Sequence, residues 1–201
     1  MEKSIVHVSK MTGKLEGLLA VNFDPTSSKF CEKMRGTFGT ICNHCYSFKA
    51  ISSYRKSCAA PFRRNTELMS SVLRCHQIPR FAPGAHVRLL AHGDMDNIQQ
   101  LYSFMVIAND NPEANFAIWT KRKDLVAKVS GTKPSNMKFI QSSSYVNEPE
   151  KLSEGFDAVF TVYDNKDKMP PEHFVCSGKK CLSCMYCYSD VSGHIAELLR
   201  N

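Results

Sequence analysis

The sequence predicts an α/β protein in which a parallel sheet forms a partial (β/α) barrel, followed by a cysteine-rich, cluster-binding tail. Three observations predict this class. Apolar strand-like stretches alternate with helix-like stretches, most strand-like stretches end in small or polar residues, and four cysteines gather near the C-terminus. Strands that alternate with helices are typical of parallel β–α–β units. A chain of 201 residues fits one such domain with a small appendage.

The first expected strand lies within residues 14–23, where a dense apolar stretch stops at the turn sequence DPTSS. The next segment contains Gly36 and Gly39 and is expected to be a loop that becomes helical from Cys42 onward. A further helix is predicted to begin at residues 65–67, because four apolar residues follow there at helical spacing.

The remainder of the chain alternates more regularly. Strands are predicted within 87–91, 115–125, 136–145 and 156–165, and helices at 98–112 and 124–131. This alternation ends near residues 164–173, so we expect a partial (β/α) barrel over 1–165 and a cysteine-rich cluster-binding segment over 166–201. Ligands of parallel α/β folds bind at the carboxyl ends of the strands.

Charge and cysteine content limit the partners and the compartment. Lys and Arg number 26 against 19 Asp and Glu, and the net charge of +7 permits an anionic partner such as a nucleotide or a nucleic acid. The stretch MEKSIVHVSKMTGKLEG lacks the apolar region of a secretory signal, and no apolar run is long enough to cross a membrane. We therefore expect no membrane association and a cytoplasmic location, where the nine cysteines favour metal binding over disulfides.

The first cysteine group is Cys31, Cys42 and Cys45, with the spacing C-x10-C-x2-C. The C-x2-C pair lets two thiolates face one metal around a turn. A structural zinc ion takes four protein ligands, whereas an iron–sulfur cluster held by three cysteines leaves one iron open. Cys58 or His44 could supply a fourth ligand, so zinc remains an alternative.

The second group is Cys176, Cys181, Cys184 and Cys187, with the spacing C-x4-C-x2-C-x2-C. Four cysteines from one short segment are closer to the runs of ferredoxin-type clusters than to the two separated pairs of zinc ribbons. The expected cofactor is a [4Fe-4S] cluster, with Zn²⁺ as the alternative.

Five stretches carry a resemblance that covers about residues 14–188. They are FCEKMRGTFGTICNHCYSFKA, VRLLAHGDMDN, FAIWTKR, IQSSS and CSGKKCLSCMYC. Together they resemble the gene product 88 family of small phage-encoded proteins, which is related to radical S-adenosylmethionine enzymes. The resemblance implies a partial barrel of the radical S-adenosylmethionine type, located in the host cytoplasm.

The same resemblance implies roles for the cysteines. Cys31, Cys42 and Cys45 would hold a [4Fe-4S] cluster whose fourth iron binds S-adenosylmethionine, and the C-terminal cysteines would hold an auxiliary cluster. The spacing differs from that of the radical enzymes, which have three residues between the first two cysteines where this chain has ten.

Cofactor contacts are also implied by the resemblance. Gly93 and Asp94 stand where the radical enzymes have a Gly-rich acidic motif that touches the methionine amino group, although this chain has Gly-Asp in place of Gly-Gly-Glu. Ser142, Ser143 and Ser144 would touch the ribose or the carboxylate.

The expected function is therefore that of an iron–sulfur protein resembling a radical S-adenosylmethionine enzyme, phage-encoded, that acts on a small molecule, a nucleotide or a nucleic-acid component. It would need an electron donor if radical chemistry occurs. Two alternatives remain: a zinc-binding module that binds nucleic acid without catalysis, and a non-catalytic iron–sulfur protein. The sequence leaves the substrate, the reaction and the oligomeric state open.

Overall fold

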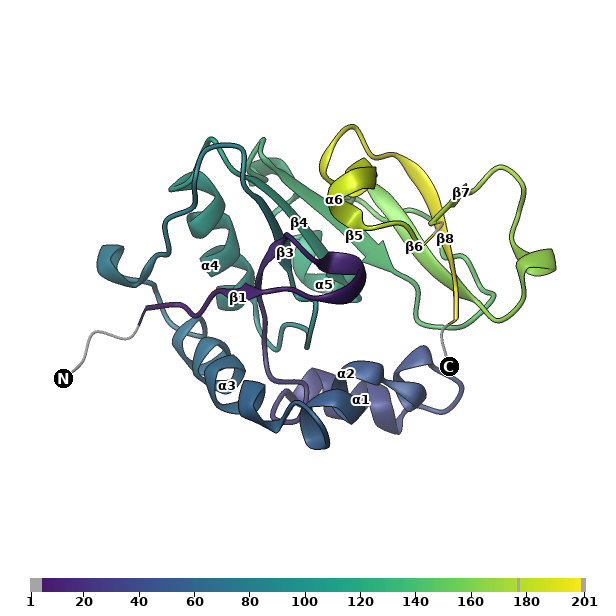
Figure 1. Ribbon diagram of the computed structural model, residues 1–201, viewed down its shortest axis with the longest axis horizontal. Coiled ribbons are helices and arrows are strands. Elements are labelled where there is room, and N and C mark those ends of the chain that lie inside the picture. The colour runs from purple at the N-terminus through teal and green to yellow at the C-terminus, as the bar shows by residue number, and fades with distance from the viewer. Residues whose placement is uncertain (1–4, 177, 200–201) are drawn as a thin grey trace.

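The computed structural model describes residues 5–176 and 178–199 (Figure 1). Residues 1–4, which begin the stretch searched for a signal peptide, lie outside the described residues, as do 177 and 200–201 of the predicted tail segment.

The chain forms one sheet and six α-helices within the described residues. The strands are β1 (Ser9–Lys10), β2 (Leu19–Val21), β3 (His86–Leu89), β4 (Asn115–Thr120), β5 (Met137–Ser142), β6 (Ala158–Tyr163), β7 (Phe174–Val175) and β8 (Gly193–Leu198). The helices are α1 (Lys29–Gly36), α2 (Tyr46–Ser52), α3 (Ala59–Leu68), α4 (Ile98–Asn109), α5 (Lys123–Val126) and α6 (Cys181–Cys184). Short 3-10 turns used below are η1 (Gly13–Leu15), η2 (Ile41–His44), η3 (Lys56–Cys58) and η7 (Tyr186–Tyr188).

The sheet has the strand order β1-β2-β3-β4-β5-β6-β8-β7, and all neighbouring strands are parallel except β1 and β2. The described strands leave the sheet open, with β1 and β7 at its edges, so it is not a closed barrel. The predicted α/β class with a mostly parallel sheet is confirmed. The sequential order from β2 to β6 is what successive β–α–β units produce.

Side chains that alternate along the strands bury two separate cores. In β4, Phe116 and Ile118 face the core beneath α4 and α5, whereas Ala117 and Trp119 face the core beneath η7. This alternation follows from the two-residue period of a strand. The C-terminal segment therefore covers part of the sheet face that α4 and α5 leave free (Figure 1).

The three helices α1, α2 and α3 lie along one edge of the molecule, at the bottom of Figure 1. Hydrogen bonds described below join them to the loops that leave β3 and β5. We call residues 29–68, which contain these helices, the helical layer.

The prediction that a helix begins at residues 65–67 is wrong. Residues 65–67 lie in the last turn of α3, which ends at Leu68, and the side chain of Val72 is 78% exposed. The reason is tertiary: Asn65 is fully buried, accepts a hydrogen bond from the His7 amide (2.7 Å) and donates to the Asn22 carbonyl (3.1 Å). It ties α3 to the sheet instead of capping a new helix.

The C-terminal segment adds two strands that the sequence analysis did not predict. After the tail cysteines the chain returns as β8, which pairs in parallel with both β6 and β7. Ile195 and Ala196 of β8 are fully buried, and the strand takes its place in the sheet through its parallel pairing with β6 and β7. Within the described residues, no helix is long and apolar enough to span a membrane.

Candidate metal centres

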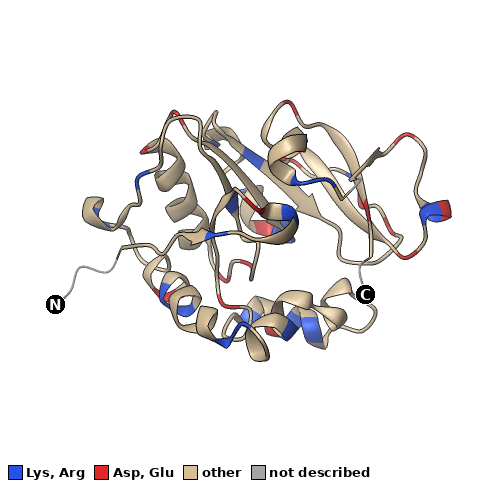
Figure 2. Cartoon of the chain, in the orientation of Figure 1, with Lys and Arg blue, Asp and Glu red and all other residues tan. Residues whose placement is uncertain are grey.

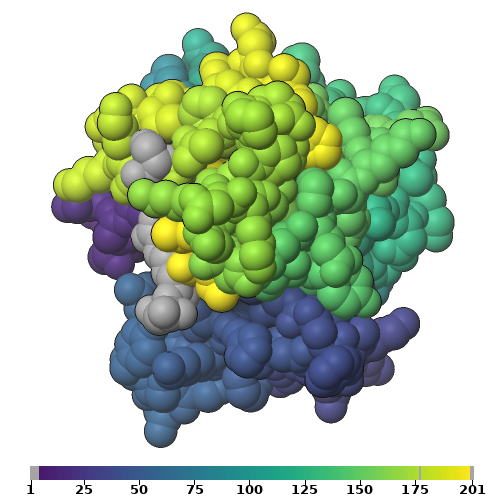
Figure 3. All heavy atoms as spheres, turned by 90° about the vertical axis from the view of Figure 1, so that its right-hand side faces the viewer, coloured from purple at the N-terminus to yellow at the C-terminus, as the bar shows by residue number. Residues whose placement is uncertain are grey.

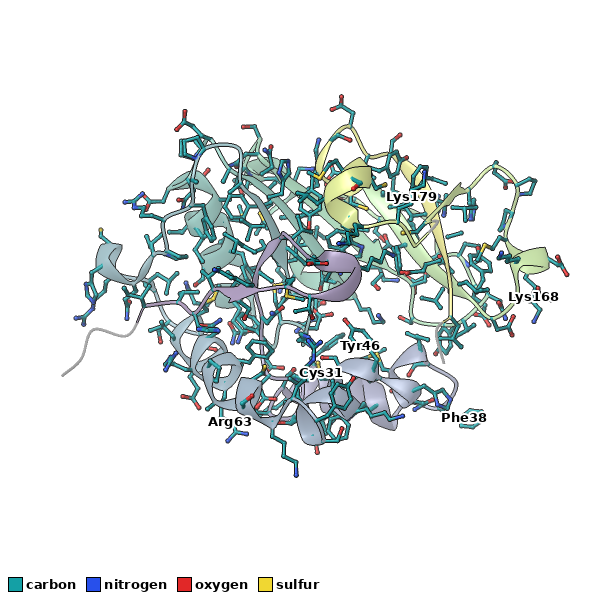
Figure 4. All side chains as sticks on the ribbon, viewed as in Figure 1. Cys31, Phe38, Tyr46, Arg63, Lys168 and Lys179 are labelled. Atoms are coloured by element: carbon teal, nitrogen blue, oxygen red, sulfur yellow. The ribbon has the colours of Figure 1, made fainter. Side chains whose placement is uncertain are left out.

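Cys31 lies in the first turn of α1 and faces the loop that leaves β3. Asp96 in that loop accepts hydrogen bonds from the Phe30 amide and the Ser28 hydroxyl, both at 2.8 Å, and so holds the start of α1. The Ser28 hydroxyl and the Asp94 amide lie within hydrogen-bonding reach of the Cys31 sulfur. Figure 4 shows Cys31 on the side of the helical layer that faces the sheet. Hydrogen bonds to the sulfur atoms are one of the features that set the reduction potential of an iron–sulfur cluster.

Cys42 lies in η2, which is fastened to the loop after β5. The Ile41 amide donates to the Ser144 carbonyl (2.8 Å), and Thr40 forms an antiparallel bridge with Tyr145. The position of Cys42 is therefore set by a strand about one hundred residues further along the chain.

Cys45 precedes α2 and is held by the loop after β3. Its sulfur accepts a hydrogen bond from the Phe48 amide (3.4 Å), so it caps this helix. The neighbouring Tyr46 hydroxyl donates to the Ala91 carbonyl (2.6 Å). Tyr46 is nonetheless 64% exposed. Its hydroxyl end reaches into the fold, and its ring lies 5.8 Å from the His92 ring, centre to centre.

Cys45 lies close enough to both Cys31 and Cys42 for their charges to interact. Burial raises the pKa of Cys31 to about 12, with Asp94 and Cys45 adding to the rise. Burial also raises the pKa of Cys42, where Lys121 opposes the rise and Cys45 adds to it. Without a metal the Cys31 and Cys42 thiols stay protonated at neutral pH, so metal binding must displace their protons.

Asp94 is buried, with 9% of its surface exposed, and its carboxylate joins the ends of two strands. It accepts hydrogen bonds from the Met95 amide (2.8 Å), the Thr120 hydroxyl (2.6 Å) and the Lys121 amide (3.0 Å). Burial raises the pKa of Asp94, whereas these three donors oppose the rise. The carboxylate assigned by resemblance to a methionine amino group is therefore already engaged by the protein.

Gly93 is required where the loops after β2 and β3 meet. Its φ is +75°, and a Cβ atom would stand 2.7 Å from the carbonyl oxygen of Phe23. The Phe23 amide donates to the His92 carbonyl at the same crossing (3.0 Å). A side chain at this position would force the two strand ends apart.

The three predicted serines have different surroundings. Lys121 donates to the Ser142 hydroxyl (3.2 Å), and the Ser143 hydroxyl is buried against Thr161 (2.7 Å). Ser144 fastens η2 through its carbonyl, as described above. Of the three serines, Ser142 is therefore the one whose hydroxyl lies beside a cation. Together, Ser142 and Lys121 could bind a carboxylate or a phosphate of a ligand.

His44 and Cys58 were candidates for a fourth ligand at this site. His44 is exposed on η2, and Cys58 ends η3 directly before α3. Neither is among the main charges that act on Cys31 or Cys42.

In the tail, all four predicted cysteines line one pocket. Cys181 and Cys184 lie one turn apart on α6, and Met185 follows with a left-handed φ of 54°. This residue turns the chain so that η7 returns Cys187 to the same pocket. Cys176, directly after β7, completes the set.

Two cations stand beside the tail cysteines. The Lys14 ammonium lies 2.9 Å from the Cys176 sulfur and also pairs with Glu197. Burial opposes it, but the hydrogen bonds to Cys176 and Glu197 raise the pKa of Lys14. Burial raises the pKa of Cys187 to about 12, with nearby cysteines adding to the rise and Arg88 opposing it.

Arg88 is a cation without a carboxylate partner among the described residues. It projects from β3, and its guanidinium carbon lies 3.1 Å from the centre of the Trp119 ring. Its Nε atom is buried and has no hydrogen-bond partner. Burial lowers the pKa of Arg88, and the acidic groups that act on it are tyrosines and the tail cysteines Cys181 and Cys187. A buried, unpaired cation is costly unless an anion compensates it.

The thiols do not converge on one point in either group. Within the described ranges, no three His, Cys, Asp or Glu side chains are close enough together to hold a single metal ion.

Sequence reasoning missed three residues that organise these sites: Lys14, Arg88 and Asp96. Arg88 had a signal, because a charged residue inside the apolar stretch HVRLL is unusual for a buried strand. Lys14 and Asp96 offered none, since their partners are distant in sequence.

Comparison with curated proteins and with solved structures finds no match to this chain. The sequence profile described as gene product 88 matches residues 7–195. That range includes both cysteine groups and most of the sheet. The chain therefore belongs to the gene product 88 family of phage proteins.

Proposed function

We propose that this chain is an iron–sulfur protein of the radical S-adenosylmethionine type, working in the reducing cytoplasm of the host. The observation that carries the proposal is the strand-end site: Cys31, Cys42 and Cys45 gather where loops leave a parallel sheet, the edge at which such folds bind ligands. Three thiolates on a [4Fe-4S] cluster leave one iron open to a cofactor.

The tail supports a second, auxiliary cluster. Zinc needs four sulfurs at about 2.3 Å from a single point, whereas a [4Fe-4S] cluster takes one thiolate on each of its irons. Four cysteines that line one pocket supply the number of thiolates that such a cluster takes. The cations Lys14 and Arg88 would offset its negative charge.

A [4Fe-4S] cluster with an open iron supplies the electron that cleaves the sulfonium bond of S-adenosylmethionine. The chain would hold the cofactor carboxylate with Lys121 and the Ser142 hydroxyl, which already bond to each other. Asp94 would act indirectly, because its oxygens hold the loops that carry the site. The substrate would be a small molecule or a nucleotide component, and a reductase or small electron carrier would be the donor.

Anaerobic expression with added iron tests the proposal. We expect a brown protein with about eight irons and matching sulfide per chain, and an electron paramagnetic resonance signal after reduction. Incubation with S-adenosylmethionine and dithionite should release 5′-deoxyadenosine, and Cys42→Ser should abolish that release while the tail keeps its iron.

Two other outcomes assign the alternatives. Full iron content without 5′-deoxyadenosine would indicate a non-catalytic iron–sulfur protein. A colourless protein with one or two zinc ions would indicate a zinc-stabilised module instead, because four cysteines are also the number that structural zinc takes.

A further inference from the structure

The positive charge of the chain is concentrated in the helical layer, residues 29–68. This segment holds eight Lys or Arg and two Asp or Glu, a net charge of +6, where the whole chain has +7. Figure 2 shows Lys and Arg along α1, α2 and α3. The remainder of the chain is nearly neutral, so an anionic partner would be drawn to this one layer.

Most of these cations are not engaged in holding the fold. Arg63 pairs with Asp24, and Arg35 donates to the Pro25 carbonyl (2.7 Å). The following five are exposed and have no carboxylate partner among the described residues: Lys29, Lys33, Lys49, Lys56 and Arg64. Free, exposed cations of this kind serve to neutralise phosphates without a folding role.

Two exposed aromatic rings belong to the same segment. Phe38, between α1 and η2, is 96% exposed, and Tyr54, between α2 and η3, is 71% exposed. Figure 4 shows Phe38 pointing away from the molecule. Rings this exposed contribute little to the core, and exposed rings beside cations are the elements on which single-stranded nucleic acids stack their bases.

We propose that the helical layer binds single-stranded nucleic acid, with phosphates on the free lysines and Arg64 and bases on Phe38 and Tyr54. A duplex fits less well, because its bases are already stacked and cannot lie on these rings. The same segment carries Cys31, Cys42 and Cys45, so a bound strand would pass beside the strand-end site. In Figure 3 this layer (blue) forms the base of the molecule below the C-terminal half. The binding surface does not depend on which metal the cysteines hold.

Binding is measured on the full chain, purified anaerobically, by fluorescence anisotropy with labelled oligodeoxythymidine and oligouridine of about 16 nucleotides. The two oligonucleotides distinguish DNA from RNA. Lys33, Lys49 and Lys56 are changed together to Gln. Affinity in ~0.1 M salt should fall by about 100-fold, and the slope of log affinity against log salt should become shallower by about 2.

A matched control removes the same charge elsewhere. Lys128, Lys151 and Lys166 are also exposed lysines with no carboxylate partner in the described structure, and they lie outside the helical layer. Their triple change to Gln should alter affinity less than about threefold. Equal losses in the two triple variants would overturn the proposal, since only net charge would then matter.

The rings are tested separately. Phe38→Ala and Tyr54→Ala should each weaken binding at least about fivefold while leaving the salt slope unchanged. A duplex of the same length should bind more weakly than either single strand. Duplex binding at equal or greater strength, or vesicles of phosphatidylserine binding as tightly as the oligonucleotides, would contradict a single-strand surface.

Discussion

The tail site and the strand-end site are assembled in opposite ways. The tail collects its thiols locally: one turn of α6, one left-handed residue at Met185 and the turn η7 bring three of the four together. The strand-end site collects its thiols from a distance. Cys31 depends on Asp96, Cys42 on Ser144 and Cys45 on the carbonyl of Ala91, all of which lie beyond residue 90.

The difference shows which site can be read from spacing. Residues a few positions apart on one turn meet whatever the remainder of the chain does. A site built by loops from several strands exists only when the sheet has formed. Ligand sites at the carboxyl edge of parallel sheets are usually of this kind. We therefore expect the tail to couple metal binding to its own folding, and the strand-end site to couple metal binding to the whole domain.

The largest effect is expected from changing Cys176, Cys181, Cys184 and Cys187 together to Ser. The chain should lose about four irons and several kcal/mol of stability, because metal binding then no longer contributes to folding. The loss would also loosen Tyr188, which packs against Trp119. Iron analysis and thermal unfolding measure both effects, and Cys75→Ser, at an exposed cysteine, is the control. An unchanged melting temperature would show that the tail folds without a metal.

A second variant separates the sites. Cys42→Ser should remove about four irons from the strand-end site and leave the tail iron in place. Cys58→Ser should retain full iron, because the proposed strand-end cluster takes only Cys31, Cys42 and Cys45 and leaves its fourth iron open. Iron counts with electron paramagnetic resonance compare the two, and iron loss in Cys58→Ser would make that residue a ligand.

Gly93→Ala tests whether strand-end geometry depends on the close crossing of two loops. A Cβ there would meet the Phe23 carbonyl at 2.7 Å, so we expect a loss of about 3 kcal/mol. Gly84 has a similar φ of +73° but open space around it, so Gly84→Ala should cost only about 1 kcal/mol. Unfolding in urea measures both. Equal costs would mean that the crossing is not tight.

The smallest effect is expected from Arg88→Met. Removing this cation should make the potential of the tail cluster more negative, on the order of tens of millivolts, since a unit charge near a partly solvated cluster contributes about 1 kcal/mol. Arg88→Lys should restore most of the difference, and a potentiometric titration followed by electron paramagnetic resonance measures it. A change in reduction potential seen only at the strand-end cluster would show that Arg88 acts on that cluster and not on the tail cluster.

Particular residues show how far sequence reasoning reaches. The apolar stretches in NFAIWT and FDAVFTVYDN are local signals, and the strands they predict are present as β4 and β6. The helix expected from residues 65–67 is absent because the Asn65 side chain hydrogen-bonds to the backbone of His7 and Asn22 and so does not cap a new helix. Strand β8 was missed because the sequence analysis treated residues 166–201 as a cysteine-rich tail, and the parallel pairing of β8 with β6 joins residues that are far apart along the chain.

By itself, the sequence determined the α/β class, the order of the central strands and the grouping of the tail cysteines, because each depends on residues that are neighbours along the chain. Only the tertiary structure decided that Asp94 holds two loops, that Arg88 stands beside the tail thiols, and that three cysteines from the helical layer meet the strand ends. Those arrangements depend on contacts between residues far apart in sequence, and such contacts exist only once the sheet has formed.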